Sequence, residues 1–142
     1  MPLTREQKAE LLGRTPLFAG VELDHLAGIA DRAVELETPR DGVILRQGEI
    51  GTGFYIVVAG LVRVVRDGET IAQLGPGEFF GELSVLDRLP RNAQVAAEEP
   101  TTCLALASWD LEAVLTDEPR IALAMLRAMA ARLRKITDEH RH

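Results

Sequence analysis

The sequence predicts a mainly β protein with flanking helices, in which an antiparallel β-roll of the jelly-roll or barrel type carries helices at both ends. From Val34 to Ala107 the chain consists of short runs rich in β-branched residues, and glycine breaks these runs at close intervals. Short strands with frequent turns are typical of antiparallel barrels and jelly rolls. On either side of this stretch, apolar residues recur with the period of a helix.

Two short helices are predicted before the β region. Thr4 and Gln7 have the spacing of a capping box, so a first helix should begin there and end near Gly13. A second helix should run from Glu22 to about Arg32. Its apolar face would carry Leu23, Leu26, Ile29 and Ala30.

The strands are predicted from their composition and their turns. The first five runs are residues 34–39, 42–49, 53–60, 61–68 and 69–75. Asp67-Gly68 is the dipeptide of a tight hairpin between the last two. Two returning strands should follow at Ala93–Ala97 and Thr101–Ala107, with Cys103 as a small core residue rather than a reactive thiol.

Two helices are predicted after the strands. Ser108 is suited to cap a helix that runs to about Thr116, with Trp109 as a large anchor, and Pro119 should begin the last helix. Four arginines repeat every seven residues along one solvated stripe of that helix: Arg120, Arg127, Arg134 and Arg141. Arg132 instead falls on the apolar face, where a guanidinium requires a partner.

Between the strands, the stretch Gly75–Val95 holds the densest arrangement of groups suited to a phosphate. Gly81 allows close approach of the backbone, and Glu82 precedes a short apolar helix, Leu83–Leu86, whose first N–H groups would suit an anion. Arg91 follows, and its planar guanidinium can hold two phosphate oxygens at once. The simpler alternative is a tight turn with a surface ion pair between the Glu and the Arg.

These residues resemble the phosphate-binding cassette of the cyclic nucleotide-binding domain family, which is found in bacterial catabolite regulators, cyclic nucleotide-gated channels and kinase regulatory subunits. The family pattern is Phe-Gly-Glu, a short apolar helix, then Pro-Arg and a small residue. The chain meets this pattern with Phe80, Gly81, Glu82, Leu83–Leu86, Pro90, Arg91 and Ala93. Upstream, Arg46–Glu49, Phe54–Val57 and Gly60 are similar to the family's early strands and turns.

The resemblance covers nearly all 142 residues and implies one cyclic nucleotide-binding domain, 1–142. Residues 1–32 would form its N-terminal helical segment. Residues 33–107 would form the β-roll, with the phosphate-binding cassette at 79–93. Residues 108–142 would form its C-terminal helices.

The resemblance also implies a role for each group of the cassette. Arg91 and backbone N–H groups would replace the water around a cyclic phosphate, while Glu82 would accept a hydrogen bond from the ribose 2′-hydroxyl. Counted without gaps from Arg91, Arg132 stands where an arginine caps the base in a bacterial channel of this family, so it would close the pocket as a lid. The expected ligand-binding residues are Phe80, Gly81, Glu82, Leu83, Ser84, Arg91, Asn92, Ala93 and Arg132.

Two questions about these residues stay open at this point. Arg132 can also reach the surface or pair with an acid instead of stacking on a base. Asn92 stands where the family usually has Ala, Ser or Thr, and Gln94 where Thr or Ser is frequent. A Thr after the arginine is associated with cyclic GMP in this family, so we expect cyclic AMP here and keep cyclic GMP as the second candidate.

Charge and composition limit the other functions. A net charge of -6 argues against broad nucleic-acid binding, and no DNA-reading element follows the last predicted helix. A single cysteine, a charged start without a signal-peptide core and the lack of a long apolar run predict a cytoplasmic protein that is not inserted in a membrane. The output would be a homodimer or an effector protein bound through the last helix, or other domains if the chain is a fragment of a larger protein.

The sequence therefore favours a non-catalytic sensor that binds a cyclic nucleotide and transmits occupancy by movement of its C-terminal helix. A phosphodiesterase would use clustered metal ligands, but His25 stands alone on its helix and Glu82 has no second acid or histidine nearby in the sequence. We therefore expect neither catalytic residues nor a metal. A third possibility is a member of the fold that has lost binding and serves as an interaction module.

Overall fold

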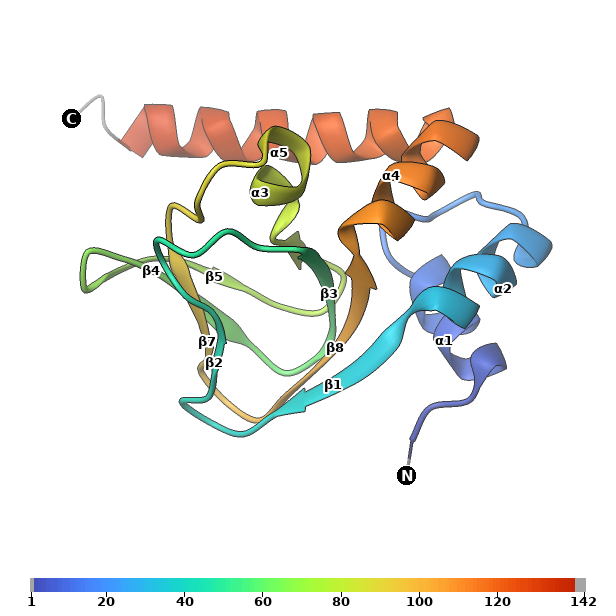
Figure 1. Cartoon of the computed structure of the whole chain (residues 1–142), viewed down its shortest axis with the longest axis horizontal. Coiled ribbons are helices and arrows are strands. Elements are labelled where there is room, and N and C mark those ends of the chain that lie inside the picture. Colours follow the sequence, from blue (N-terminus) through green and yellow to red (C-terminus); the bar gives the residue numbers. More distant parts are fainter. Residues whose placement is uncertain (1, 140–142) are drawn as a thin grey trace.

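The computed structural model, which describes residues 2–139, is a β-roll of two antiparallel four-stranded sheets (Figure 1). One sheet contains, in spatial order, β1 (Val34–Thr38), β8 (Thr101–Ala107), β3 (Gly53–Ala59) and β6 (Phe79–Phe80). The other contains β2 (Val43–Leu45), β7 (Gln94–Ala97), β4 (Val62–Arg66) and β5 (Glu69–Leu74). The predicted mainly β fold is confirmed.

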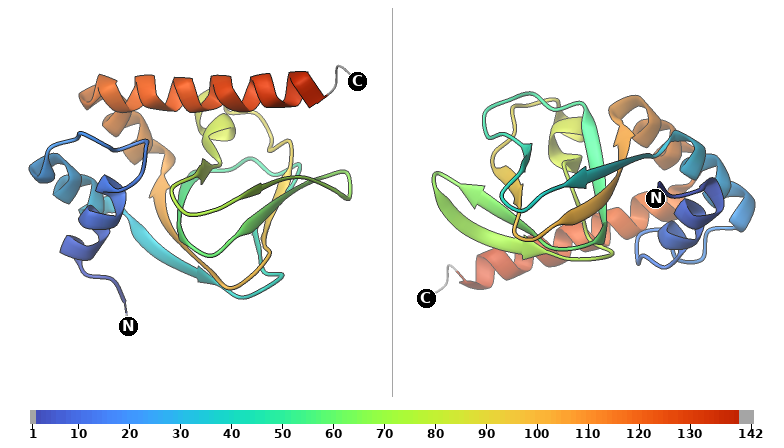
Figure 2. Two further views of the ribbon diagram at one scale, coloured as in Figure 1. Left: turned by 180° about the vertical axis from the view of Figure 1, so that it is seen from behind. Right: turned by 90° about the horizontal axis from the view of Figure 1, so that it is seen from below.

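Helices cover one end and one side of this roll (Figures 1 and 2). The five helices of the described chain are α1 (Arg5–Gly13), α2 (Leu23–Arg32), α3 (Glu82–Asp87), α4 (Ser108–Asp117) and α5 (Pro119–Glu139). The first two gather at one end of the roll, and α5 runs along its side, at the top of Figure 1. This arrangement leaves α3, the short helix of the cassette, beneath α5.

The ends of α1 are set by local hydrogen bonds that the sequence predicted. Thr4 caps the helix: its Oγ1 accepts from the backbone N–H of Gln7 at 3.1 Å, and its own N–H donates to Gln7 Oε1 at 2.9 Å. The capping box is therefore confirmed, as are the end at Gly13 and the start of α5 at Pro119. These features depend on residues close in sequence, so a sequence pattern is enough to find them.

Two expectations about apolar residues are wrong. Leu23 is 71% exposed, because the core covers α2 only from Leu26 onward. Trp109 is 68% exposed and does not anchor α4; Leu111 and Val114 are the buried residues of that helix.

The expected cap of α4 is also wrong. The N-cap position is Ala107, and no side chain bonds to the first turn. Ser108 instead is the first helical residue, and its backbone N–H donates to the carbonyl of Thr52 at 2.8 Å. A contact with the β3 edge therefore takes the place of a side-chain cap.

The core has two parts because β3 and β8 present side chains on both faces. Phe54 and Leu104 face the helices and join a cluster that includes residues of α1, α2, α4 and α5. Val57 and Cys103 face the second sheet and belong to the interior of the roll. Burial raises the pKa of Cys103 to about 12, in agreement with its predicted place as a core residue.

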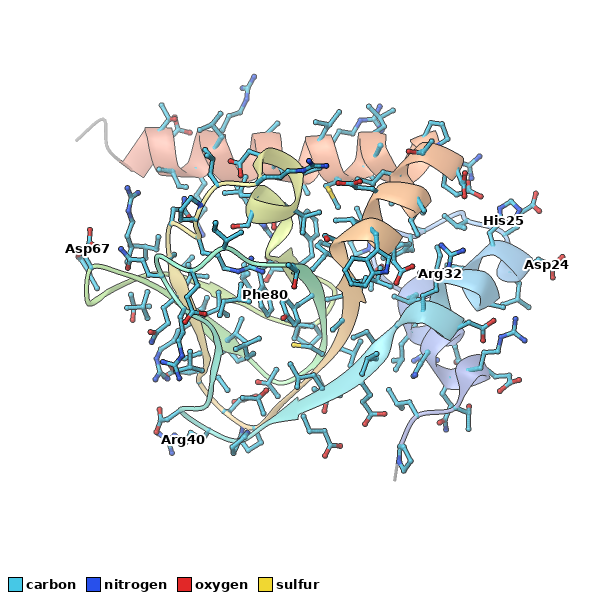
Figure 3. All side chains as sticks on the ribbon, in the orientation of Figure 1. Asp24, His25, Arg32, Arg40, Asp67 and Phe80 are labelled. Atoms are coloured by element: carbon cyan, nitrogen blue, oxygen red, sulfur yellow. The ribbon has the colours of Figure 1, made fainter. Side chains whose placement is uncertain are left out.

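Two further features follow the sequence pattern. Asp67 and Gly68 both have positive φ, 51° and 81°, as a tight β4–β5 hairpin requires, and Asp67 lies at the hairpin tip in Figure 3. On α5, the predicted stripe is exposed at Arg120, Arg127 and Arg134, while Arg141 lies outside the described residues. The buried face of α5 holds Ile121 and Met125.

Candidate nucleotide-binding site

The cassette begins where β6 ends. Gly81 has φ 91° and is the N-cap of α3. A Cβ atom at Gly81 would lie 2.8 Å from the carbonyl oxygen of Gly53 in β3, so both the backbone angle and the close approach favour glycine. This turn places Glu82 at the first position of α3, inside the molecule.

Arg91 extends into the cassette from the loop before β7. Its side chain is buried, with 8% of the residue exposed. Nη2 donates to the carbonyl of Gly53 at 2.9 Å, and Nη1 donates to the carbonyl of Gly81 at 3.2 Å. The Arg91 backbone is fixed on the other side, because its N–H donates to Glu49 O at 2.7 Å and its carbonyl accepts from Gly48 N–H at 2.8 Å. The guanidinium is thus held in one position.

The charge of Arg91 has no anion beside it. Among the side chains of residues 2–138, no carboxylate oxygen lies within 4.0 Å of the Arg91 guanidinium. Burial lowers the pKa of Arg91, and the more distant Tyr55, Glu82 and Glu49 only partly oppose this. A buried cation that is bonded only to carbonyl oxygens is an incomplete arrangement, because carbonyls do not neutralise it.

A second glycine makes room for this guanidinium. A Cβ atom at Gly51 would overlap the Arg91 guanidinium, at 1.8 Å from Nη2. Gly51 therefore lets the loop before β3 pass against the arginine, and it was not predicted as a site residue. No local pattern in the sequence indicates this requirement, because Arg91 lies far from Gly51 along the chain.

Glu82 is buried and paired with the C-terminal helix. Only 5% of the residue is exposed, and its Oε1 accepts from Arg132 Nη1 at 3.0 Å. Burial raises the pKa of the Glu82 carboxyl, while the positive charge of Arg132 acts in the opposite direction. The surface ion pair between Glu82 and Arg91 that we considered as an alternative is not what the structure shows.

Arg132 makes three contacts with the cassette side of the roll. Besides the pair with Glu82, Nη2 donates to the carbonyl of Phe79, and the guanidinium lies over the Phe79 ring, 4.4 Å from its centroid. The predicted need for a partner is met by an acid, which was one of the two alternatives. The lid over a base stays a prediction.

The remaining predicted residues lie in different surroundings. Ser84 is buried and its Oγ donates to the carbonyl of Leu89 at 2.9 Å, and Ala93 is also buried. Leu83 and Asn92 are exposed. Leu83 lies in the first turn of α3, where backbone N–H groups have no partner within the helix.

Phe80 lies inside the roll, as Figure 3 shows, and stacks on Tyr55 with ring centroids 5.1 Å apart. Its neighbour Phe79 faces the helices and supports Arg132. The Phe-Gly-Glu pattern predicts Phe80 and not Phe79 as a site residue, and a strand of two aromatic residues has no period that distinguishes its two faces.

Other kinds of site are limited by what the described chain contains. In the part of the chain whose side chains are described, residues 2–138, no three His, Cys, Asp or Glu side chains gather closely enough to hold a metal ion. The Nδ1 of His25 pairs with Glu118, the C-cap residue of α4. None of the helices in this part of the chain combines the length and apolar character needed to cross a membrane.

Comparison with known proteins agrees with this geometry. A family model of the cyclic nucleotide-binding domain matches residues 35–118, which include Glu82 and Arg91 but not Arg132. The chain is 36% identical over 129 residues to the cyclic AMP receptor protein of Thermus thermophilus, covering 85% of this chain and 58% of that protein. It is 36% identical over 114 residues to a cyclic nucleotide-gated potassium channel of Mesorhizobium japonicum, covering 80% of this chain and 31% of the channel.

A solved structure also resembles this chain. The crystal structure of the N-terminal domain of a transcriptional regulator from Streptomyces coelicolor matches with a TM-score of 0.68 and 36% identity, covering 92% of this chain and 94% of that one. The chain thus spans 58% of the receptor protein's length and nearly all of this isolated domain. The family model matches more than half of the 142 residues, and the chain therefore belongs to the cyclic nucleotide-binding domain family.

Proposed function

We propose that this chain is a non-catalytic sensor that binds a cyclic nucleotide at the cassette and transmits its occupancy through movement of α5. The observation that carries the proposal is the buried Arg91 guanidinium, which donates to the carbonyls of Gly53 and Gly81 and has no carboxylate within 4.0 Å in the described chain. A singly charged cyclic phosphate would supply the missing anion. The names of the relatives, a cyclic AMP receptor protein and a cyclic nucleotide-gated channel, support the same ligand class.

The phosphate would be bound by Arg91 together with backbone groups of the cassette. Gly81 and the first turn of α3 bring main-chain N–H groups to the side of the guanidinium, which already contacts the Gly81 carbonyl. The backbone N–H groups proposed as donors are those of Gly81, Leu83, Ser84 and Ala93. Fixed donors of this kind replace the water that the phosphate loses on binding.

The ribose would be read by Glu82. Its carboxylate accepts from Arg132 in the structure, so a ribose 2′-hydroxyl must share Glu82 with Arg132 or displace it. Displacement would free Arg132 to stack on the base as the proposed lid. Ligand binding and the position of α5 would then be coupled through one carboxylate.

The test is calorimetric titration of the chain with cyclic AMP and cyclic GMP, repeated on Arg91→Ala. We expect saturable binding, tighter for cyclic AMP. Loss of one or more charge-assisted hydrogen bonds of about 1.5–3 kcal/mol should weaken the variant at least about tenfold. Arg88→Ala is the matched control, since the Arg88 side chain is 82% exposed and lies in the same loop. Equal affinities of wild type and Arg91→Ala would reject the site.

A comparison of cyclic AMP with its 2′-deoxy analogue tests Glu82 separately. The analogue lacks the hydroxyl that would donate to the Glu82 carboxylate, so the wild type should bind it more weakly than cyclic AMP. If the contact with Glu82 is the cause, Glu82→Gln should bind the two nucleotides with equal affinity. The same titrations, with ligand recovered intact after incubation, test the proposal that the chain is not an enzyme. Conversion of the nucleotide would contradict it.

One observation favours the alternative of an interaction module that does not bind nucleotide. Both cassette charges already have contacts inside the chain: Arg91 with two carbonyls, and Glu82 with Arg132. Asn92 and Gln94 also depart from the family pattern. No heat of binding for either nucleotide, in a protein that unfolds cooperatively, would favour this alternative.

The proposed output surface is the outer side of α5. Three leucines are exposed there at a spacing close to that of a coiled-coil seam: Leu123 (47%), Leu126 (61%) and Leu133 (65%). A second copy of the chain or an effector protein would cover them. Sedimentation velocity with and without cyclic AMP distinguishes the two, because only the homodimer changes the mass of the purified chain.

A further inference from the structure

The loop between β2 and β3, residues 46–52, fixes the position of Arg91. Its backbone makes two hydrogen bonds with the backbone of Arg91: Gly48 N–H donates to the Arg91 carbonyl at 2.8 Å, and Glu49 O accepts from Arg91 N–H at 2.7 Å. Gly51 of the same loop lies against the guanidinium, where a Cβ atom would have no room. The place of Arg91 in the cassette therefore depends on where this loop lies.

The first part of this loop is not anchored in the core. Residues 46–50 are all exposed, and even the apolar Ile50 is 67% exposed. Among them, only Gln47 has a side chain that hydrogen-bonds to another segment of the described chain. A segment without buried side chains opens easily unless hydrogen bonds hold it. The side chain of Gln47 is thus the main attachment of the loop on the side away from Arg91.

Gln47 is attached to the tip of the β4–β5 hairpin. Its Nε2 donates to Asp67 Oδ1 at 2.8 Å, and its Oε1 accepts from the backbone N–H of Asp67 at 3.0 Å. Both polar atoms of the amide are used, so the side chain is held in one orientation. Figure 3 shows Asp67 at the tip of the hairpin. Strand β4 also pairs with β7, which follows the Arg91 loop, so the hairpin and Arg91 belong to the same sheet.

We propose that Gln47 and Asp67 are positioning residues for Arg91, so that the tip of the β4–β5 hairpin affects how tightly the cassette binds its nucleotide. This rests on the proposed nucleotide site at Arg91. The two residues that bond to the Arg91 backbone, Gly48 and Glu49, directly follow Gln47, so a displacement of Gln47 reaches Arg91 within two residues. The coupling is reciprocal, so a nucleotide at Arg91 should in turn stabilise the contact with Asp67.

The contact can be broken and then restored by exchange of its donor and acceptor. Gln47→Glu removes the Nε2 donor and places a second carboxylate beside Asp67. Asp67→Asn keeps an acceptor at Oδ1, and asparagine tolerates the positive φ of this position, 51°. The double variant Gln47→Glu with Asp67→Asn has the donor on the other side and the net charge of the wild type. Arg46→Gln is the control for charge, because it makes the same change of charge on the adjacent exposed residue.

Amide hydrogen exchange in the free protein tests the link between the hairpin and Arg91. In Gln47→Glu, the amides of Gly48 and Arg91 should exchange several times faster than in the wild type, whereas the double variant and Arg46→Gln should exchange normally. The amide of Cys103, which is buried in β8, is the reference for global unfolding. Unchanged exchange at Gly48 and Arg91 in Gln47→Glu, or equal acceleration at Cys103, would overturn the proposal.

Calorimetric titration with cyclic AMP tests the consequence for binding. Gln47→Glu should weaken binding about three- to tenfold, the effect of losing one hydrogen bond that positions Arg91. The double variant, Asp67→Asn and Arg46→Gln should each stay within about twofold of the wild type, because surface charge alone has a small effect.

An equal loss in Arg46→Gln, or a loss that the double variant does not restore, would overturn the proposal. So would normal affinity in Gln47→Glu when the wild type binds. A wild type that binds neither nucleotide would instead reject the proposed function, and the exchange rates of the free protein would still decide whether the hairpin positions Arg91.

Discussion

The replacement of Arg91 by methionine should remove nucleotide binding without a large loss of stability in the free protein. Methionine keeps an unbranched side chain in the space beside Gly51, but it has no charge to bury and no donor for the carbonyls of Gly53 and Gly81. No carboxylate among the side chains of residues 2–138 lies within 4.0 Å of Arg91 to neutralise its charge, so burial of this charge is unfavourable in the free state.

The two opposing contributions have similar size. Two hydrogen bonds from a charged donor stabilise by about 1.5–3 kcal/mol each, while removal of an ion from water costs several kcal/mol, so the net change on substitution should be within about 1–2 kcal/mol. With cyclic AMP at 100 times its Kd, the wild type should gain about 2.7 kcal/mol of unfolding free energy. A variant with a hundredfold weaker Kd should gain only about 0.4 kcal/mol at the same concentration.

Urea unfolding with and without cyclic AMP measures both quantities. Circular dichroism is the suitable signal, because Trp109 is 68% exposed and its fluorescence would respond weakly to unfolding. Arg88→Met, at an exposed position of the same loop, should keep the full gain from the ligand. The reasoning is refuted if Arg91→Met keeps that gain, or if it loses several kcal/mol without ligand, since Arg91 would then be a structural residue.

Three further experiments test Arg132, Glu82 and the buried Cys103. Arg132→Ala should weaken cyclic AMP up to about tenfold in calorimetric titrations through loss of the proposed lid; unchanged affinity would remove Arg132 from the site and leave the cassette. Burial raises the pKa of Glu82 above its ordinary 4.5, so ionisation of this carboxyl destabilises the fold as the pH rises above 4.5. In urea unfolding, Glu82→Gln should therefore gain stability relative to wild type between pH 4.5 and pH 7. A difference in unfolding free energy between the two proteins that stays constant with pH would contradict this. Cys103 is buried and its pKa is raised to about 12, so it should resist iodoacetamide at pH 8 until urea unfolds the protein. Mass spectrometry measures the labelling. Rapid labelling of the native protein would contradict the assignment of Cys103 to the core.

The features that the sequence predicted correctly depend on neighbours along the chain. The Thr4 capping box, the Asp67-Gly68 hairpin and the start of α5 at Pro119 all follow from bonds or backbone angles within a few residues. The cassette follows the same rule: Gly81 predicts a turn, Glu82 begins the short helix after it, and Arg91 follows that helix and returns its guanidinium to Gly81.

The features that it could not predict depend on distant segments. Trp109 has the size of a core residue but is largely exposed. Neither its size nor its place in the helix indicates that it is exposed. The partner of Arg132 is Glu82, 50 residues away in the sequence. The helical periodicity shows that Arg132 needs a partner, but it does not identify that partner. Gly51 is required by a side chain that approaches it from Arg91, which no local pattern records.

The separate partners of the two cassette charges bear on how a sensor would work. Arg91 and Glu82 are both buried and carry opposite charges, yet Arg91 bonds to carbonyls of the roll and Glu82 bonds to Arg132 of α5. A ligand changes a conformational equilibrium only by the difference in its affinity for the two states. A phosphate at Arg91 would contact the roll in either position of α5, whereas a ribose hydroxyl at Glu82 competes with Arg132 only while α5 is in place. It follows that the ribose contact, rather than the phosphate contact, would couple nucleotide binding to the helix, and that 2′-deoxy cyclic AMP would occupy the site with less effect on α5.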